Sequence, residues 1–230
     1  MPDGAFKSIQ EVFSTLNKRK QEYVVMRNYD ILFTASITEQ DRPNIDILCA
    51  DPCRIAELLG ATPKMGDSVR YYIIINDRRV ELTLRTPKDG YFCEQWAVDM
   101  LRRRRMLRNI FVLNRIDQFY SHLYHALVQC CDFEPLRPSI ADGIKLRGYR
   151  ADVSTETLML ELEAFMRCNG YRFGFLEDAS VPLLWKRISD RSLLDFDRRR
   201  HLEHLFAPLD KIRTCSLWLI RHALTYRHRR

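Results

Sequence analysis

The sequence predicts an α/β (α+β) fold in which a mixed-sheet lobe is followed by a helical C-terminal lobe. Short β-branched and aromatic segments alternate with helical patterns over the first half of the chain. From about residue 138 onward, apolar residues recur mainly at helical spacing. Because the composition changes near residues 95–115, we expect a sheet lobe over residues 1–113 and a helical lobe over residues 114–230, packed together.

The first elements are expected to be a helix and two strands. Apolar side chains recur at helical spacing over residues 4–20, which predicts an amphipathic helix. A strand is expected over residues 23–26 and a second at 45–49, separated by a polar loop. Asp51 and Pro52 then predict the start of a helix, as N-cap and first helical residue.

A hairpin and two further helices are expected next. The runs VRYYIII and VELTLR, separated by the polar residues 76–79, predict a β-hairpin. An arginine-rich helix over residues 93–105 and a strand over 110–113 follow. A helix over residues 115–131 has one apolar face, and its opposite face carries Asp117, Ser121, Tyr124 and His125.

The C-terminal part is predicted to be mostly helical. Ser154 is a suitable N-cap for a helix that ends at Asn169 and Gly170. The segments GYRFGF and VPLLW are expected to be short and extended, and helices over about 190–206 and 208–226 complete the chain.

The chain is basic, with a formal net charge of +7. This balance favours anionic partners such as nucleotides, nucleic acid or phosphoglycans, and solvated helix faces are the alternative interpretation. The arginine clusters lie at residues 102–105, 198–200 and 227–230.

Cysteine usage and hydropathy indicate a soluble protein of the reducing cytoplasm. The seven cysteines are odd in number and form no CxxC pair, which favours reduced thiols over disulfides or a zinc site. His201 and His204 lack a nearby third ligand, so zinc is not expected there. The N-terminus has no signal-peptide core, and no run approaches the roughly 18 apolar residues of a membrane span.

Asp46 is the most informative residue, because it lies inside the apolar run IDILCA. A carboxylate in a buried strand is costly unless it is paired or bound to a metal ion. Two interpretations follow from this position. Asp46 belongs to a functional site, or it is a structural acid paired with Arg27 or Arg85.

The order of elements resembles the nucleotidyltransferase fold of the DNA polymerase β-like superfamily. That layout is a helix, a strand, a loop, a strand with an apolar-Asp-apolar motif, a helix, and a further strand with an acidic residue. The segments VVMRNY, NIDIL, KDGYF, QFYSHLYHAL and NGYRF are similar to those of uncharacterised bacterial and viral nucleotidyltransferase-like proteins, often associated with surface-glycan synthesis. The resemblance covers most of residues 22–175 and implies a nucleotidyltransferase-like mixed-sheet lobe.

The resemblance also implies a metal site. The superfamily holds Mg²⁺ or Mn²⁺ with two aspartates on one strand and a third carboxylate on a neighbouring strand. Residues at i and i+2 suit this role because they point to the same face of a sheet. Here the two strand positions are Asn44 and Asp46, and Thr83 takes the third position, with Glu81 two residues earlier. We therefore expect Asp46 and Glu81 as catalytic metal ligands, assisted by Asn44.

Five further residues are predicted to bind the nucleotide. Arg27 and Asn28 end the first strand, where a guanidinium can hold phosphate oxygens bidentately. Arg85 and Asp89 flank the loop that leaves the hairpin, and His125 lies off the apolar face of its helix. For the arginines and Asp89 the alternative is structural ion pairing, and for His125 it is a structural hydrogen bond.

The functional expectation is metal-dependent transfer of a nucleotidyl or phosphoryl group to a sugar or small acceptor, with degenerate metal ligands. The alternative is a pseudoenzyme of the same fold that binds a nucleotide, a nucleotide-sugar or nucleic acid, the last through the arginine clusters. A structural role in a glycan-synthesis assembly is the third interpretation.

Overall fold

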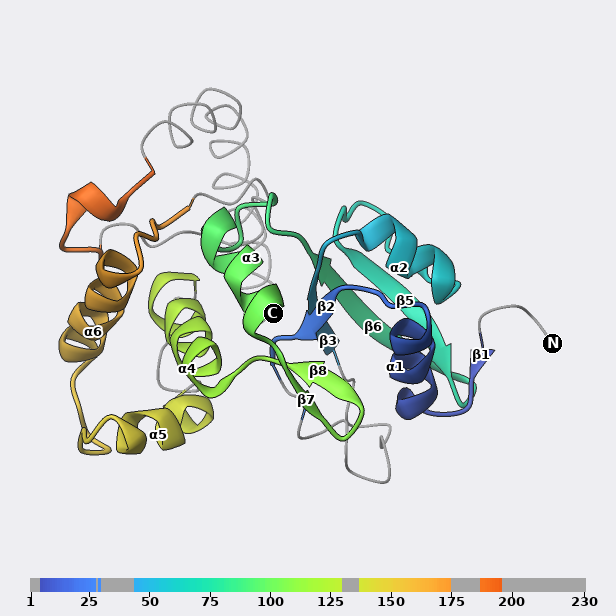
Figure 1. Ribbon diagram of the computed structural model, residues 1–230, viewed down its shortest axis with the longest axis horizontal. Helices are drawn as coiled ribbons and strands as arrows, with labels where there is room; N and C mark the ends of the chain where they lie inside the picture. The colour runs from blue at the N-terminus through green and yellow to red at the C-terminus, as the bar shows by residue number, and fades with distance from the viewer. Residues whose placement is uncertain (1–4, 28, 30–43, 130–136, 175–186, 196–230) are drawn as a thin grey trace, which may run out of the picture.

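The computed structural model describes residues 5–27, 29, 44–129, 137–174 and 187–195 (Figure 1). The fold is mixed α/β, which confirms the predicted class. Asn28, the VPLLW segment, the predicted helix over 208–226 and most of that over 190–206 lie outside the described residues.

The described strands form one eight-stranded mixed sheet. Its order is β1-β5-β6-β3-β2-β8-β7, and β4 pairs with β5. The pairs β1–β5, β3–β6 and β2–β8 are parallel, and the other pairs are antiparallel. The strands are β1 Ala5–Phe6, β2 Tyr23–Val25, β3 Asn44–Cys49, β4 Thr62–Pro63, β5 Arg70–Ile75, β6 Arg78–Arg85, β7 Arg105–Leu107 and β8 Ile110–Val112.

Helices cover both faces of the sheet. The α-helices are α1 Ile9–Lys18, α2 Pro52–Leu58, α3 Glu94–Arg103, α4 Arg115–Tyr124, α5 Arg137–Leu146 and α6 Thr155–Cys168. A π-helix, η2 His125–Gln129, continues α4, and η5 Arg191–Leu193 is a short 3-10 helix. The predicted N-caps Asp51 and Ser154 are confirmed, since each side chain accepts a hydrogen bond from the first turn of its helix.

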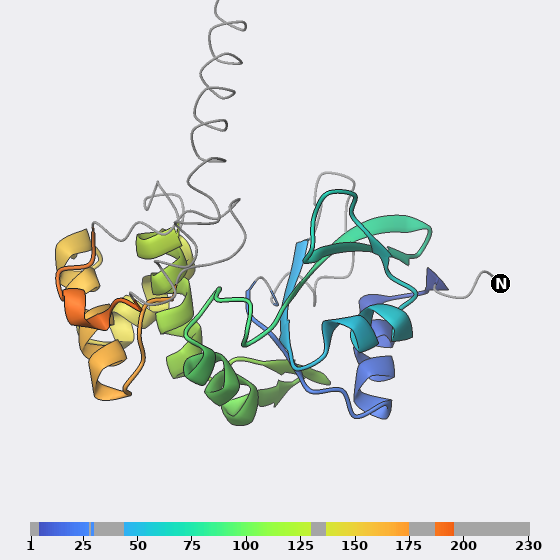
Figure 2. The ribbon, with the colours of Figure 1, turned by 90° about the horizontal axis from the view of Figure 1, so that it is seen from above.

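Strand alternation divides the apolar residues between two cores. Val25, Ile45 and Ile47 pack with α1 and α2 on one face. On the other face, Val24 and Leu48 pack in a larger cluster with residues of α3, α4, α5 and α6. This larger cluster joins residues from both sides of the predicted boundary at 113/114, which itself stays a prediction (Figures 1 and 2).

Several predicted elements differ in their limits. The first helix starts at Ile9, because Ala5 and Phe6 pair with β5. The arginine-rich helix ends at Arg103, since Arg104 has an extended backbone conformation and Arg105 begins β7.

The face of α4 opposite its apolar side chains is more buried than the sequence predicted. Asp117, Ser121 and Tyr124 were expected opposite the apolar face, yet all three are buried. Asp117 accepts hydrogen bonds from Trp96 and Arg103 of α3, and Tyr124 packs on Trp96. The helix is therefore covered on both sides.

No helix in the part of the chain that the structure describes is long and apolar enough to cross a membrane.

Candidate functional site

The pairing of β3 with β6 places the predicted metal ligands on one face of the sheet. Asn44 is opposite Glu81, and Asp46 is opposite Thr83. Alternate strand residues share a face, so these four side chains lie on the side that Leu48 also occupies. The predicted residues therefore share one face, as their spacing indicated. The residue directly opposite Asp46, however, is Thr83, which offers a hydroxyl group and not a carboxylate.

Asp46 is ion-paired with Arg27. The Asp46 Oδ2 atom accepts from Nε of Arg27 at 3.1 Å and lies 3.0 Å from its Nη2. Its Oδ1 atom accepts from Nδ2 of Asn44 at 3.1 Å, and Oδ1 of Asn44 accepts from the Thr83 hydroxyl at 3.0 Å. Both carboxylate oxygens of this buried acid therefore have partners. Of the two partners considered from sequence, Arg27 is the one observed.

Glu81 is engaged elsewhere on the same face. Its Oε2 atom accepts from Nζ of Lys64 at 3.0 Å, and its Oε1 atom lies 3.6 Å from Nε of Arg70. Arg70 is the first residue of β5, and Lys64 directly follows β4, which pairs with β5. Glu81 is thus directed to the basic residues of the hairpin instead of completing a carboxylate cluster with Asp46.

These residues do not fit a divalent ion. Mg²⁺ requires several hard oxygen ligands, usually with one or two carboxylates. The Asp46 carboxylate is here opposite a threonine, and the Arg27 guanidinium already neutralises it at 3.0 Å. Among the described residues, no group of three or more His, Cys, Asp and Glu side chains could hold a metal ion.

Arg27 is held by two groups and keeps one edge open. Its Nη2 atom donates to Oη of Tyr91 at 3.0 Å, in addition to the bonds to Asp46. Burial alone would lower the pKa of Arg27, but the interactions with the Tyr91 hydroxyl and the Asp46 carboxylate outweigh it and raise that pKa, so Arg27 stays charged. The Nη1 group makes no hydrogen bond to any described residue, and 19% of the side chain is exposed.

Tyr91 connects Arg27 to the π-helix. The Tyr91 hydroxyl lies 3.1 Å from Nδ1 of His125, which is also 3.2 Å from Oε1 of Gln129. Gln129 in turn donates to the Tyr91 carbonyl at 2.8 Å. Burial and the nearby charge of Arg27 lower the pKa of His125 to about 4, so the imidazole is neutral at pH 7. Single π-turns of this kind occur frequently at functional sites.

Arg85 and Asp89 lie beside the same tyrosine. The Arg85 guanidinium is 4.6 Å from the Tyr91 ring centroid, and its Nη1 is 3.7 Å from Oδ2 of Asp89. Asp89 also accepts from the backbone N–H groups of Thr86 and Tyr91. Asp89 therefore shapes the loop that positions Tyr91, and Arg85 is almost fully buried.

No family model matches the chain, and no curated protein or solved structure matches it significantly.

The structure brings together most of the predicted site residues. Asp46 bonds to Arg27, Tyr91 links Arg27 to His125, and Arg85 packs on the Tyr91 ring. Asn28 lies outside the described residues. Tyr91 was not predicted as a site residue, although it lies in the KDGYF segment. Its position after the loop at the end of β6 was the available signal.

The arginines at residues 102–105 lie only partly on the surface: Arg102 and Arg103 are exposed, and the other two are half-buried. Arg103 is paired with the buried Asp117, Arg104 packs on the ring of Phe111, and Arg105 donates to a backbone carbonyl. Arg102 is largely exposed, with 72% of its side chain accessible. Trp96, which lies on the same helix as Arg102 and Arg103, is buried in the core. The other two arginine clusters lie outside the described residues.

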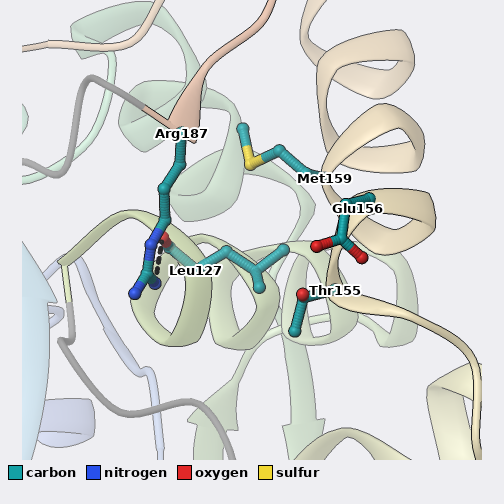
Figure 3. A pocket seen from close by; sticks show the side chains of 5 residues that line it. All are labelled: Leu127, Thr155, Glu156, Met159 and Arg187. Atoms are coloured by element: carbon teal, nitrogen blue, oxygen red, sulfur yellow. Dashed lines mark hydrogen bonds between the residues drawn. The ribbon is translucent and has the colours of Figure 1, made fainter.

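A separate pocket of about 260 Å³ lies in the helical part of the molecule (Figure 3). The Arg187 guanidinium closes one side by donating to the Leu127 carbonyl at 3.0 Å, and Glu156 lies on the other side of the Leu127 side chain. None of the predicted site residues lines it. The lining residues are Leu127, Thr155, Glu156, Met159 and Arg187.

Proposed function

We propose that this chain is a nucleotidyltransferase-like protein that binds the phosphate of a nucleotide or nucleotide-sugar at Arg27, without a metal ion and without metal-dependent transfer. The observation that carries this proposal is the state of Arg27. Asp46 and Tyr91 fix its guanidinium, while Nη1 faces no described partner and the side chain is partly exposed.

A guanidinium in this state is suited to phosphate. Its planar donors match phosphate oxygens, and its charge persists at any physiological pH. The bonds to Asp46 and Tyr91 hold the side chain before a ligand arrives, which lowers the entropy lost on binding. In this arrangement Asp46 acts as the counter-ion of Arg27 and takes no part in metal ligation.

The element order also supports the proposal. The sequence of α1, β2, β3, α2 and the β5–β6 hairpin agrees with the layout that the resemblance to nucleotidyltransferases implies. We further infer a reducing, cytoplasmic location, because the described cysteines are free thiols: Cys49, Cys53, Cys93 and Cys168.

Metal-dependent transfer stays a prediction from the sequence. It requires Asp46 to exchange Arg27 for a divalent ion, with Glu81 released from Lys64 and Arg70. Binding of nucleic acid through the arginine clusters also stays a prediction. It would be recognised by a steep salt dependence for generic oligonucleotides.

The test is calorimetric titration of nucleoside triphosphates and nucleotide-sugars in the presence of EDTA, and again with Mg²⁺ or Mn²⁺. We expect binding in EDTA that Arg27→Gln weakens at least tenfold and that Arg27→Lys weakens less. Arg150→Gln, which removes an exposed arginine far from these contacts in sequence, should bind as the wild type does. Binding that needs metal, or binding that Arg27→Gln leaves unchanged, would overturn the proposal.

A further inference from the structure

The sheet face that carries Asp46 continues onto the β5–β6 hairpin. Across β3, β6 and β5, Asp46 is in register with Thr83 and Arg70, and Asn44 is in register with Glu81 and Tyr72. These rows share one face of the sheet, and β5 lies two strand spacings, about 10 Å, from β3. The Arg27 guanidinium, which contacts Asp46, therefore lies on the same sheet face as Arg70 and Tyr72 of β5.

The hairpin end of the face is accessible. Asp46 and Thr83 are buried, whereas Ile74 is 40% exposed and Arg79, its partner on β6, is exposed. The apolar side chains of β5 and β6 on the other face pack in the core that α1 and α2 cover, and Figure 2 shows these two helices on one side of the hairpin. Among the described elements, α1 and α2 pack on the apolar face of the hairpin, while on its polar face Ile74 and Arg79 are exposed and Tyr72 is half-buried.

Tyr72 lies at the hairpin end of this face and contacts two cations. The Arg79 guanidinium carbon is 3.5 Å from the centre of the Tyr72 ring, so the guanidinium packs directly on the ring. The Lys64 ammonium is 5.8 Å from the same centre. Lys64 is also paired with Glu81, but Arg79 makes no ion pair with any residue that the structure describes. The Arg79 residue itself is exposed.

We propose that Tyr72 and Arg79 form a subsite for the base of the nucleotide whose phosphate binds Arg27. This inference rests on the proposed function. Nucleobases stack on aromatic rings and on guanidinium planes, and cations at both ends of the face suit an anionic ligand. A nucleoside di- or triphosphate is long enough to reach from the space above β3 to β5. Because every base has a π-face, the subsite recognises a nucleobase without strong preference for one base.

The experiment compares a nucleoside triphosphate with inorganic tripolyphosphate, by calorimetry in EDTA. The two ligands differ by the nucleoside, so their ratio of affinities isolates the subsite. For the wild type we expect the nucleotide to bind more tightly by tenfold or more. Tyr72→Ala should weaken nucleotide binding by about tenfold, as expected for loss of one stacking contact. It should leave tripolyphosphate binding unchanged, and Tyr72→Phe should retain both.

Arg79→Gln is the second variant, and because Arg79 is exposed it removes the guanidinium without disturbing the core. Arg79→Gln should also weaken binding of the nucleotide and leave binding of tripolyphosphate unchanged. Arg150→Gln should change the affinity for neither ligand. The subsite would be overturned if the wild type bound the nucleotide and tripolyphosphate with equal affinity. It would also be overturned if Tyr72→Ala lost binding of both ligands together. If Arg27→Gln leaves both ligands unaffected, the phosphate site fails, and that result is distinct from failure at Tyr72 alone.

Discussion

Asp46 and Arg27 are each costly to bury alone, and each is the main charged partner of the other. Removal of one member of a buried ion pair leaves an uncompensated charge, whereas removal of both leaves none. Only 9% of the Asp46 side chain and 19% of the Arg27 side chain are exposed, so solvent screens this pair weakly.

We expect Asp46→Asn and Arg27→Gln each to lower the free energy of unfolding by about 3 kcal/mol, as for other broken buried pairs. The double variant should lose clearly less than the sum of the two single losses. Urea denaturation of the four proteins in the cycle measures this coupling. Strictly additive losses would show that the two side chains do not depend on each other.

His125 makes stability depend on pH. Burial and the nearby charge of Arg27 lower the pKa of His125 in the folded protein to about 4, from the ordinary value of 6.5. Between these two pKa values the unfolded chain binds a proton at His125 and the folded chain does not. The free energy of unfolding therefore falls as the pH drops from 6.5 towards 4. Between pH 7 and pH 5 this group should remove about 2 kcal/mol of stability.

The comparison of wild type with His125→Gln measures that effect. The variant should lose about 2 kcal/mol less than the wild type between pH 7 and pH 5 in urea denaturation. Parallel curves for the two proteins over this range would contradict a buried, neutral His125.

Packing between neighbouring helices is a property of the elements. Gly143 of α5 faces α4, and a methyl group placed on it would overlap the ring of Phe119. Replacing glycine by alanine inside an exposed helix normally stabilises by up to about 1 kcal/mol. Here Gly143→Ala should instead destabilise by about 1–3 kcal/mol, because the ring must move out of a packed core.

Thermal and urea unfolding of Gly143→Ala check this sign. Ala141→Gly, at an exposed position of the same helix, is the control and should cost about 1 kcal/mol. A more stable Gly143→Ala variant would show that α5 does not pack against Phe119 as described.

Elements with strong local signals could be predicted from the sequence, and those set by tertiary packing could not. The N-caps Asp51 and Ser154 and the β5–β6 hairpin follow from short-range chemistry, and all are present. The π-helix His125–Gln129 shares the apolar pattern of an α-helix, so periodicity alone does not reveal it.

The sequence could predict which residues of β3 belong to the site, but not which side chains bond to one another. Spacing on β3 identified Asn44 and Asp46, and alternation placed them on one face. The choice of Arg27 as the partner of Asp46 depends on where β2 ends relative to β3, and Tyr91 enters through the loop after β6. Such contacts between distant segments have no local signature in the sequence.

At the scale of the molecule, one polar network ties the sheet part to the helical part. The buried Asp117 of α4 accepts from Trp96 and Arg103 of α3, and the Tyr171 hydroxyl bonds to Arg103 and Asp99. The large apolar cluster crosses the same region. The two parts therefore share their main core.

We expect the described parts of the chain to unfold in one step because of this shared core. Near-ultraviolet and far-ultraviolet circular dichroism should give coincident thermal transitions. Asp117→Asn, which leaves Arg103 with a weaker partner, should shift both transitions to lower temperature together. Separate transitions, with only one moved by the substitution, would indicate two independently folded lobes.

The claim that Asp46 neutralises Arg27, and does not ligate a metal, is tested most directly by titrating Mn²⁺ into the protein and measuring free Mn²⁺ by electron paramagnetic resonance. Wild type and Asp46→Asn should bind Mn²⁺ equally weakly, because Arg27 already holds the Asp46 carboxylate. Stoichiometric Mn²⁺ binding by the wild type that disappears in Asp46→Asn would contradict the account and restore the metal-dependent transferase.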